Sequence, residues 1–310
     1  MLVQALTAAN GGDLLWDAHL LQVVLCLDHI RTLDYVSKQA TAQVASVQEQ
    51  QLLRTARDQR DGSMRAWVEA TLFPLAVLRC WPAGDHRYKL GRRKRQRAEC
   101  DSVFNRLQDW QAAGPLRDEL IREILRTPEP DRSSRHFSEL QKRRRALKLA
   151  REVGQFRKAV QALLSHGVAV FDDKKQVLET LRRLHPQGAL PTMPPGWCPP
   201  EEGIVIDNDG VLAALRSFPK GTACGRSGLR AAHLLQMSGA LPAYLTTLTS
   251  VVAGLAKGSA PKEFAPFLAS APLVPLLKPD GKSIRPIAIG EILRRLVSKV
   301  LLRAIRHRAA

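Results

Sequence analysis

Apolar residues recur at helical spacing through most of the first 125 residues. The pattern predicts a long polar helix from Ser37 to Arg60 and a more apolar one from Met64 to Leu78, kinked at Pro74. Tryptophans and polar faces alternate along these helices, but no recognisable catalytic cluster stands among them. The pattern therefore predicts a helical region and assigns it no role.

Three short helices are expected between Phe137 and Leu184, separated at Gly154 and Gly167. Asp172 and Asp173 precede the third of them. A pair of aspartates after an apolar segment is typical of a polymerase metal motif, but no strand pattern leads into this pair. The helical run that follows favours a helix N-cap instead.

A proline-rich segment separates these helices from the rest of the chain. Residues 186–203 contain six prolines, which indicates an extended linker. We therefore divide the chain into four consecutive parts: a helical region of unknown role at 1–130, a basic helical linker unit at 131–185, the proline-rich linker at 186–203 and a final region at 204–310.

The final region begins with helices and contains two extended segments. Helices are predicted after Asp209, from about Leu229 and from Pro242, since proline is tolerated at the first helical position. A terminal helix is expected from Gly290 to about Arg308. Between them, SAPLVPLL and IRPIAI have the apolar character of strands, so the predicted fold class is α+β, mostly α-helical, with one β-hairpin.

The predicted hairpin turn carries the strongest chemical signal. Pro279, Asp280 and Gly281 supply the fixed φ, the backbone-bonding side chain and the freedom of positive φ that tight turns need. Lys278, Lys282 and Arg285 flank this turn. Point-charge lysines and a planar guanidinium suit the oxygens of a phosphate chain, and Pro286 indicates an edge strand. An exposed hairpin with solubilising charges explains the same residues equally well.

The net charge of the chain favours a polyanionic partner. The chain has 47 Lys and Arg against 29 Asp and Glu, a formal net charge of +18. Two basic stretches, at 89–97 and 141–151, and a stripe on the terminal helix concentrate it, although such runs are often only solvated faces. The predicted nucleic-acid patch consists of Arg92, Arg93, Lys94, Arg95, Arg143, Arg144, Arg145, Arg295, Lys299 and Arg303.

Other classes are disfavoured by the sequence. No run of 18 apolar residues predicts a membrane span, so no membrane partner is expected. The five cysteines show no C-x-x-C spacing, and the N-terminus lacks the features of a secretory signal. We expect a nuclear or cytoplasmic protein that is not secreted.

The stretch PLLKPDGKSIRPIAIGEILRRLVSKVL, residues 275–301, resembles the fingers region of reverse transcriptases of non-LTR retrotransposons. Upstream, PKGTACGRSGLRAAHLL, residues 219–235, resembles the segment that precedes these motifs, with Arg226 where the family usually has proline. The helices of VGQFRKAVQALLSHGVAVFDD and LRRLHPQ resemble the family's linker. The resemblance covers roughly the last half of the chain, from about Val153.

This resemblance implies an RNA-directed DNA polymerase whose partners are an RNA template, a DNA primer or target and a deoxynucleoside triphosphate, within a ribonucleoprotein. It implies that Lys278 and Arg285 contact the triphosphate, with Lys282 as a second cation. It also implies template contacts, by Gly225, Arg226, Gly228, Arg230, Pro286 and Ile287.

The family's metal-binding aspartates lie in the palm, which we expect to be missing from this chain. We therefore predict no catalytic residue here, no bound cofactor, and Mg²⁺ only in a complete polymerase with a palm. The expectation is a reverse-transcriptase fragment, truncated before the palm and inactive alone, that can self-associate through its exposed palm-facing surface. The alternative is a non-catalytic basic nucleic-acid-binding protein or retroelement remnant.

Overall fold

The fold is described by a computed structural model. It covers residues 14–309 except 28, 59–63, 83, 129–138, 152–153, 155, 165–173, 186–187, 189–195, 197–202 and 279–282. The chain forms two compact units, each discontinuous in sequence. Unit 1 comprises Met1–Pro130, Ile204–Ser270 and Gly290–Ala310, and unit 2 comprises Asp131–Gly203 and Ala271–Ile289.

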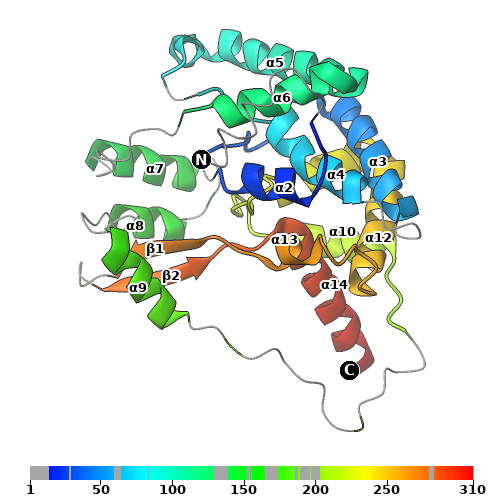
Figure 1. Ribbon diagram of the computed structural model, residues 1–310. Coiled ribbons are helices and arrows are strands. Elements are labelled where there is room, and N and C mark those ends of the chain that lie inside the picture. The colour runs from blue at the N-terminus through cyan, green and yellow to red at the C-terminus, as the bar shows by residue number, and fades with distance from the viewer. Residues whose placement is uncertain are drawn as a thin grey trace. The chain divides into compact units, whose positions relative to one another are not determined.

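Unit 1 is built from helices, as the apolar spacing predicts (Figure 1). In chain order they are α2 (Ala18–Leu25), α3 (Thr41–Asp58), α4 (Met64–Val77), the short 3₁₀ helix η1 (His86–Lys89), α5 (Arg92–Ala112), α6 (Gly114–Arg126), α10 (Asn208–Arg216), α11 (Ala231–Ala240), α12 (Pro242–Ala256), α13 (Ala265–Ala269) and α14 (Ile292–Ala309). Pro242 opens α12, which confirms that prediction.

Unit 2 contains α7 (Glu139–Arg151), α8 (Phe156–Leu164) and α9 (Lys174–Leu184), the three short helices predicted between Phe137 and Leu184. It also holds the predicted hairpin, strands β1 (Leu273–Leu277) and β2 (Ile284–Ala288), which pair antiparallel and form the one sheet within the described residues. The mostly helical α+β class is thus confirmed. The proposed capping role of Asp172 and Asp173 lies outside the described residues.

Helix α4 lies at the centre of unit 1 because nearly every side of it is apolar. It packs against α2, α3, α5 and α6, and Trp67, Leu72 and Phe73 are almost completely buried. The helix continues through Pro74, and the backbone N–H of Leu78 still donates to the Pro74 carbonyl, 2.9 Å away. Burial on all sides offsets the hydrogen bond that a proline removes from a helix interior.

The first 130 residues and the segment after residue 204 share one hydrophobic core. Helix α3 packs on α11 and α12, where the buried Tyr244 hydroxyl donates to Gln48 at 3.0 Å. The rings of Trp67 and Phe264 lie 4.7 Å apart. Because these contacts are internal to one core, the helical region of unknown role also supports the elements that follow the linker.

Two buried carboxylates link the N-terminal segments of unit 1. Glu69 accepts from Arg117 at 2.9 Å, while Asp118 accepts from the Leu14 amide at 2.7 Å and the Trp16 indole at 2.9 Å. Each buried charge therefore has partners, as burial requires. Within the part of the chain that the structure describes, no helix combines the length and apolar character needed to span a membrane.

His233 in α11 is fully buried against the loop at Leu33. Its Nε2 lies 2.8 Å from the Leu33 carbonyl oxygen, so the neutral ring donates from that nitrogen, and Nδ1 has no partner. Burial lowers the pKa of His233 to about 4, with the positive charge of Arg230 adding to the effect. The hydrogen bond to Leu33 and the charge of Asp34 oppose it only in part.

The pKa of His233 predicts an acid-sensitive fold. Unfolded histidine binds a proton near pH 6.5, whereas the folded ring stays neutral down to about pH 4, so stability is lost as pH falls through this window. Below pH 4 the total loss in the free energy of unfolding from this residue is roughly 3 kcal/mol. The free energy of unfolding, measured by denaturant titration across this range, should fall less steeply in His233→Gln, which keeps an N–H donor. Equal slopes in the two proteins would contradict this account.

Candidate nucleotide and nucleic-acid interface

The hairpin holds the first predicted site. Leu276 pairs with Arg285 and Leu277 with Ile284, and the Lys278 amide donates to the Ser283 carbonyl at 2.9 Å. This register places Lys278 directly at the turn. Pro279, Asp280, Gly281 and the predicted phosphate contact Lys282 lie outside the described residues.

Helix α9 packs against the hairpin within unit 2 (Figure 1). Between them lies an open pocket of about 370 Å³. Its lining contains two cationic side chains, three neutral polar ones and an apolar base: Lys278, Arg183, Gln176, Thr180, Ser283, Val177, Leu184 and Ile284. This composition suits an anionic ligand with an apolar portion.

Arg183 is the residue that sequence reasoning missed at this site. The sequence 174–184 predicts a basic helix, but nothing in its spacing indicates that the helix packs on a hairpin formed much later in the chain. Arg285, in contrast, is exposed on β2 and does not line the pocket. Alternation along the strand places it on the face opposite the buried Ile284. Lys278 therefore shares the lining of the pocket with Arg183 and not with Arg285.

The second predicted site, the segment from Gly225 to Arg230, is packed inside unit 1. The carboxylate of Glu291 accepts from the Ser227 amide at 3.1 Å and the Ser227 hydroxyl at 2.7 Å. A Cβ on Gly225 would lie 2.5 Å from that carboxylate. Glycine at this position is therefore required by the close approach of Glu291.

Gly228 is also explained by packing. Its φ is +72°, and an added Cβ would lie 2.4 Å from the Thr32 methyl group. The Gly228 carbonyl accepts from the Thr32 hydroxyl at 2.6 Å. Nearby, Arg230 forms an ion pair with Asp34 at 3.3 Å, and Arg226 is half-buried. Of the proposed template contacts, Pro286 and Ile287 are half-buried on β2, where they pair with Pro275 and Val274.

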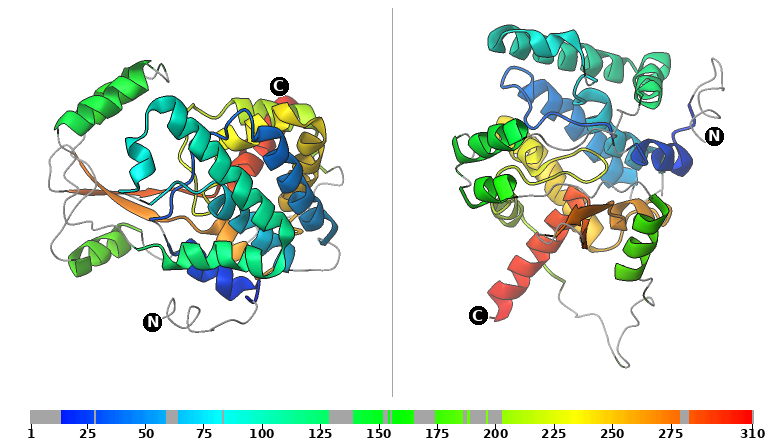
Figure 2. Two further views of the ribbon diagram at one scale, coloured as in Figure 1. Left: turned by 90° about the horizontal axis from the view of Figure 1, so that it is seen from above. Right: turned by 90° about the vertical axis from the view of Figure 1, so that its left-hand side faces the viewer.

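The basic stripe on α14 divides into two parts. Arg295 donates to the Ala223 carbonyl at 3.0 Å and Lys299 to the Ser217 hydroxyl at 3.0 Å, and both cations lie over the ring of Phe218. These two side chains hold the loop after α10. Arg303 is exposed, on the C-terminal turns that extend from the bundle in the right-hand view of Figure 2.

The remaining members of the predicted patch are accessible. In α5, Arg92, Arg93 and Lys94 are exposed, and Arg95 pairs weakly with Glu99 at 3.8 Å. In α7 of unit 2, three exposed side chains continue the basic character, those of Arg143, Arg144 and Arg145.

Metal ligands do not gather in the described part of the chain, where no group of three or more His, Cys, Asp and Glu side chains has the arrangement to hold an ion. Comparison with known proteins adds no relative: no protein-family model, no curated protein and no solved structure matches the chain.

Gly228→Ala should destabilise the protein by at least about 2 kcal/mol, because alanine is strained at positive φ and its Cβ would collide with Thr32. Gly239 provides the matched control, since nothing lies within 4 Å of an added Cβ there and it is in helix α11. Gly239→Ala should instead stabilise by roughly 0.5–1 kcal/mol. Denaturant midpoints measure both changes, and equal midpoints for the two variants would contradict the packing role of Gly228.

Proposed function

We propose that this chain is part of an RNA-directed DNA polymerase of the non-LTR retrotransposon type, and that its hairpin contacts the incoming deoxynucleoside triphosphate. The observation that carries the proposal is the cationic pocket between α9 and the hairpin. It supports the proposal because Lys278, which the resemblance associates with the triphosphate, lines that pocket together with a second cation.

The chemistry of the pocket fits a phosphate chain. Lys278 supplies a compact charge and Arg183 a planar donor fork, and hydroxyl groups of Thr180 and Ser283 offer further donors. Its volume of about 370 Å³ falls within the range of small-molecule sites. Arg285, the other proposed triphosphate contact, is exposed on β2 and does not line the pocket, so the pocket chemistry relies on Lys278 and Arg183.

The resemblance implies that palm carboxylates would hold Mg²⁺, and among the described residues no group of three or more His, Cys, Asp and Glu side chains could hold an ion. The proposal therefore concerns binding of nucleotide and template, and no step of it passes through a metal. The RNA template and the DNA primer or target are the macromolecular partners.

A non-catalytic nucleic-acid-binding protein is the second candidate. The exposed arginines of α5 and α7, which lie outside the hairpin, favour it. The two candidates differ in whether the hairpin pocket selects a nucleoside triphosphate over inorganic phosphate, because a backbone-binding surface has no use for a base.

Combining Lys278→Ala with Arg183→Ala in the full chain should weaken binding of a fluorescent deoxynucleoside triphosphate at least roughly tenfold, because each change removes a charge-assisted contact. Fluorescence anisotropy measures the affinity, and circular dichroism checks the fold. Lys262→Ala, at an exposed lysine of unit 1, controls for the loss of a cation. Unchanged affinity in the double variant would sink the pocket assignment.

Nucleic-acid binding should weaken steeply with salt. Each neutralised phosphate contributes a slope of about −0.9 in log K against log salt for duplexes and about −0.7 for single strands. Titrating a labelled oligonucleotide at several salt concentrations gives the slope. A flat response would contradict both candidate functions, because each relies on cations that displace counterions.

A further inference from the structure

Charge is concentrated in unit 1 between the end of α4 and the middle of α5. The segment from Arg79 to Arg106 holds nine Lys and Arg against three Asp and Glu, a third of the net charge of the chain. The first turn of α5 contains no acidic residue and begins with Arg92, Arg93 and Lys94. Cations at a helix N-terminus oppose the helix dipole. Such departures from local preference are typical of functional surfaces.

Tyr88 stands in the middle of this basic segment, and 41% of it is exposed. Its hydroxyl donates to the Trp81 carbonyl at 2.9 Å, and its ring packs edge to face on the Trp81 ring, with centroids 5.5 Å apart. Trp81 is itself buried, and its indole N–H donates to Ser102 at 3.2 Å. The tyrosine ring is therefore held in place from behind while part of it faces solvent.

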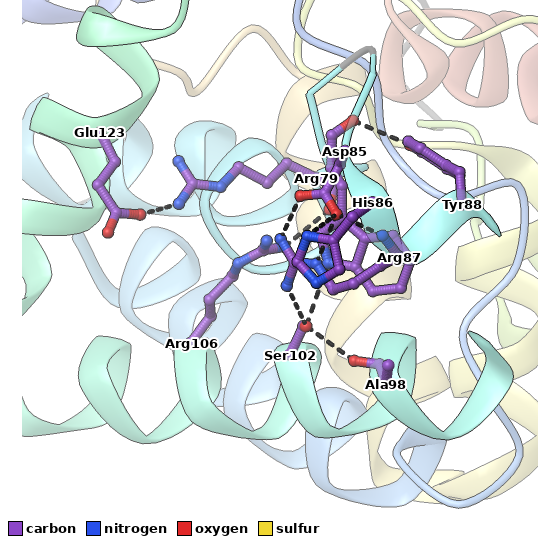
Figure 3. Close-up of polar contacts among 10 residues, drawn as sticks. Arg79, Asp85, His86, Arg87, Tyr88, Ala98, Ser102, Arg106 and Glu123 are labelled. Atoms are coloured by element: carbon purple, nitrogen blue, oxygen red, sulfur yellow. Dashed lines mark hydrogen bonds and ion pairs between the residues drawn. The ribbon is translucent and has the colours of Figure 1, made fainter. Parts of the chain in front are cut away.

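Arg87 and Asp85 complete this support (Figure 3). The Arg87 side chain donates two hydrogen bonds to Asp85, at 2.9 and 2.6 Å, and the Arg87 amide donates a third at 2.8 Å. The guanidinium lies 4.4 Å from the centre of the Trp81 ring. The hydrogen bonds from Arg87 hold the pKa of Asp85 well below its usual range. The Asp85 carboxylate is thus engaged by Arg87, and the His86 ring lies 3.6 Å from it.

Arg106 leaves a positive charge unbalanced beside this network. It donates to the Arg79 carbonyl at 2.7 Å, and among the described residues no carboxylate forms an ion pair with it, whereas Arg79 itself pairs with Glu123. Burial, followed by the charges of Arg79 and Arg87, lowers the pKa of Arg106 to about 10. A bound anion would reduce this repulsion.

We propose that the surface formed by η1 and the first turns of α5 binds single-stranded nucleic acid, with a base stacked on Tyr88 and the neighbouring phosphates held by Arg92, Arg93 and Lys94. A rigid aromatic ring next to a row of cations is the arrangement that single-strand binding uses, since every base has a π-face and every linkage has a charge. An acidic peptide would satisfy the cations but would leave the exposed ring without a role. This site lies in unit 1 and does not depend on the hairpin pocket.

A titration of binding affinity against salt concentration separates the contribution of base stacking from that of charge. Tyr88→Leu in the full chain should weaken binding of a labelled single-stranded RNA roughly tenfold and leave the salt slope unchanged, because stacking releases no counterions. Tyr88→Phe keeps the ring and should bind as the unmodified protein does. Arg92→Gln with Arg93→Gln should instead reduce the slope by about 0.7 for each lost phosphate contact. Fluorescence anisotropy gives the affinities.

Tyr35, an exposed tyrosine elsewhere in unit 1, is the matched control, and Tyr35→Leu should leave affinity unchanged. A DNA strand of the same sequence distinguishes RNA from DNA as the ligand. The proposal is overturned if Tyr88→Leu binds as tightly as Tyr88→Phe, if a duplex binds better than the single strand, or if polyglutamate competes and its binding also depends on Tyr88. Triphosphate binding by the Lys278 and Arg183 variants tests the hairpin separately.

Discussion

The buried contact between Glu291 and Ser227 is the constraint on which the C-terminal part of unit 1 depends. One carboxylate accepts both the amide and the hydroxyl of Ser227, directly before the first residue of α14. With its start fixed there, α14 buries Leu296 and Val300 in the shared core and packs on α10 and α12. The approach is possible because Gly225 has no side chain where the Glu291 carboxylate lies.

The same loop connects the two halves of unit 1. Thr32 donates to the Gly228 carbonyl, Arg230 pairs with Asp34, and the amide and carbonyl of Val36 are both hydrogen-bonded by Gln236. Each contact joins the first 40 residues to the segment after residue 225. In the sequence, the basic and glycine-containing segment from Gly225 to Arg230 suggests ligand binding. In the structure its first role is in packing, because its polar groups form hydrogen bonds and an ion pair with other parts of unit 1.

The basic side chains of the chain fall into two groups. Arg117, Arg295 and Lys299 contact carboxylates, carbonyls or aromatic faces of their own unit, and so contribute to the fold. Arg92, Arg93 and Lys94 are exposed at the start of α5, shortly after η1 in the sequence, and they contribute little to packing. A count of basic residues does not separate these groups, since the distinction depends on what each side chain meets.

The sequence by itself determined the local elements. The apolar period predicts α3, α4 and the three helices of unit 2, Pro242 opens α12, and two apolar runs around a turn sequence form the hairpin. These features depend on residues that are close in sequence, so the spacing of apolar residues and the turn sequence are enough to predict them. Only the tertiary structure decided that Arg183 and Lys278 line the same pocket, that Gly228 lies against Thr32 and that Arg295 covers Phe218. Hydrophobic burial selects which surfaces pack together. A periodic sequence pattern shows that one face of a helix is apolar, but it does not show which other element covers that face.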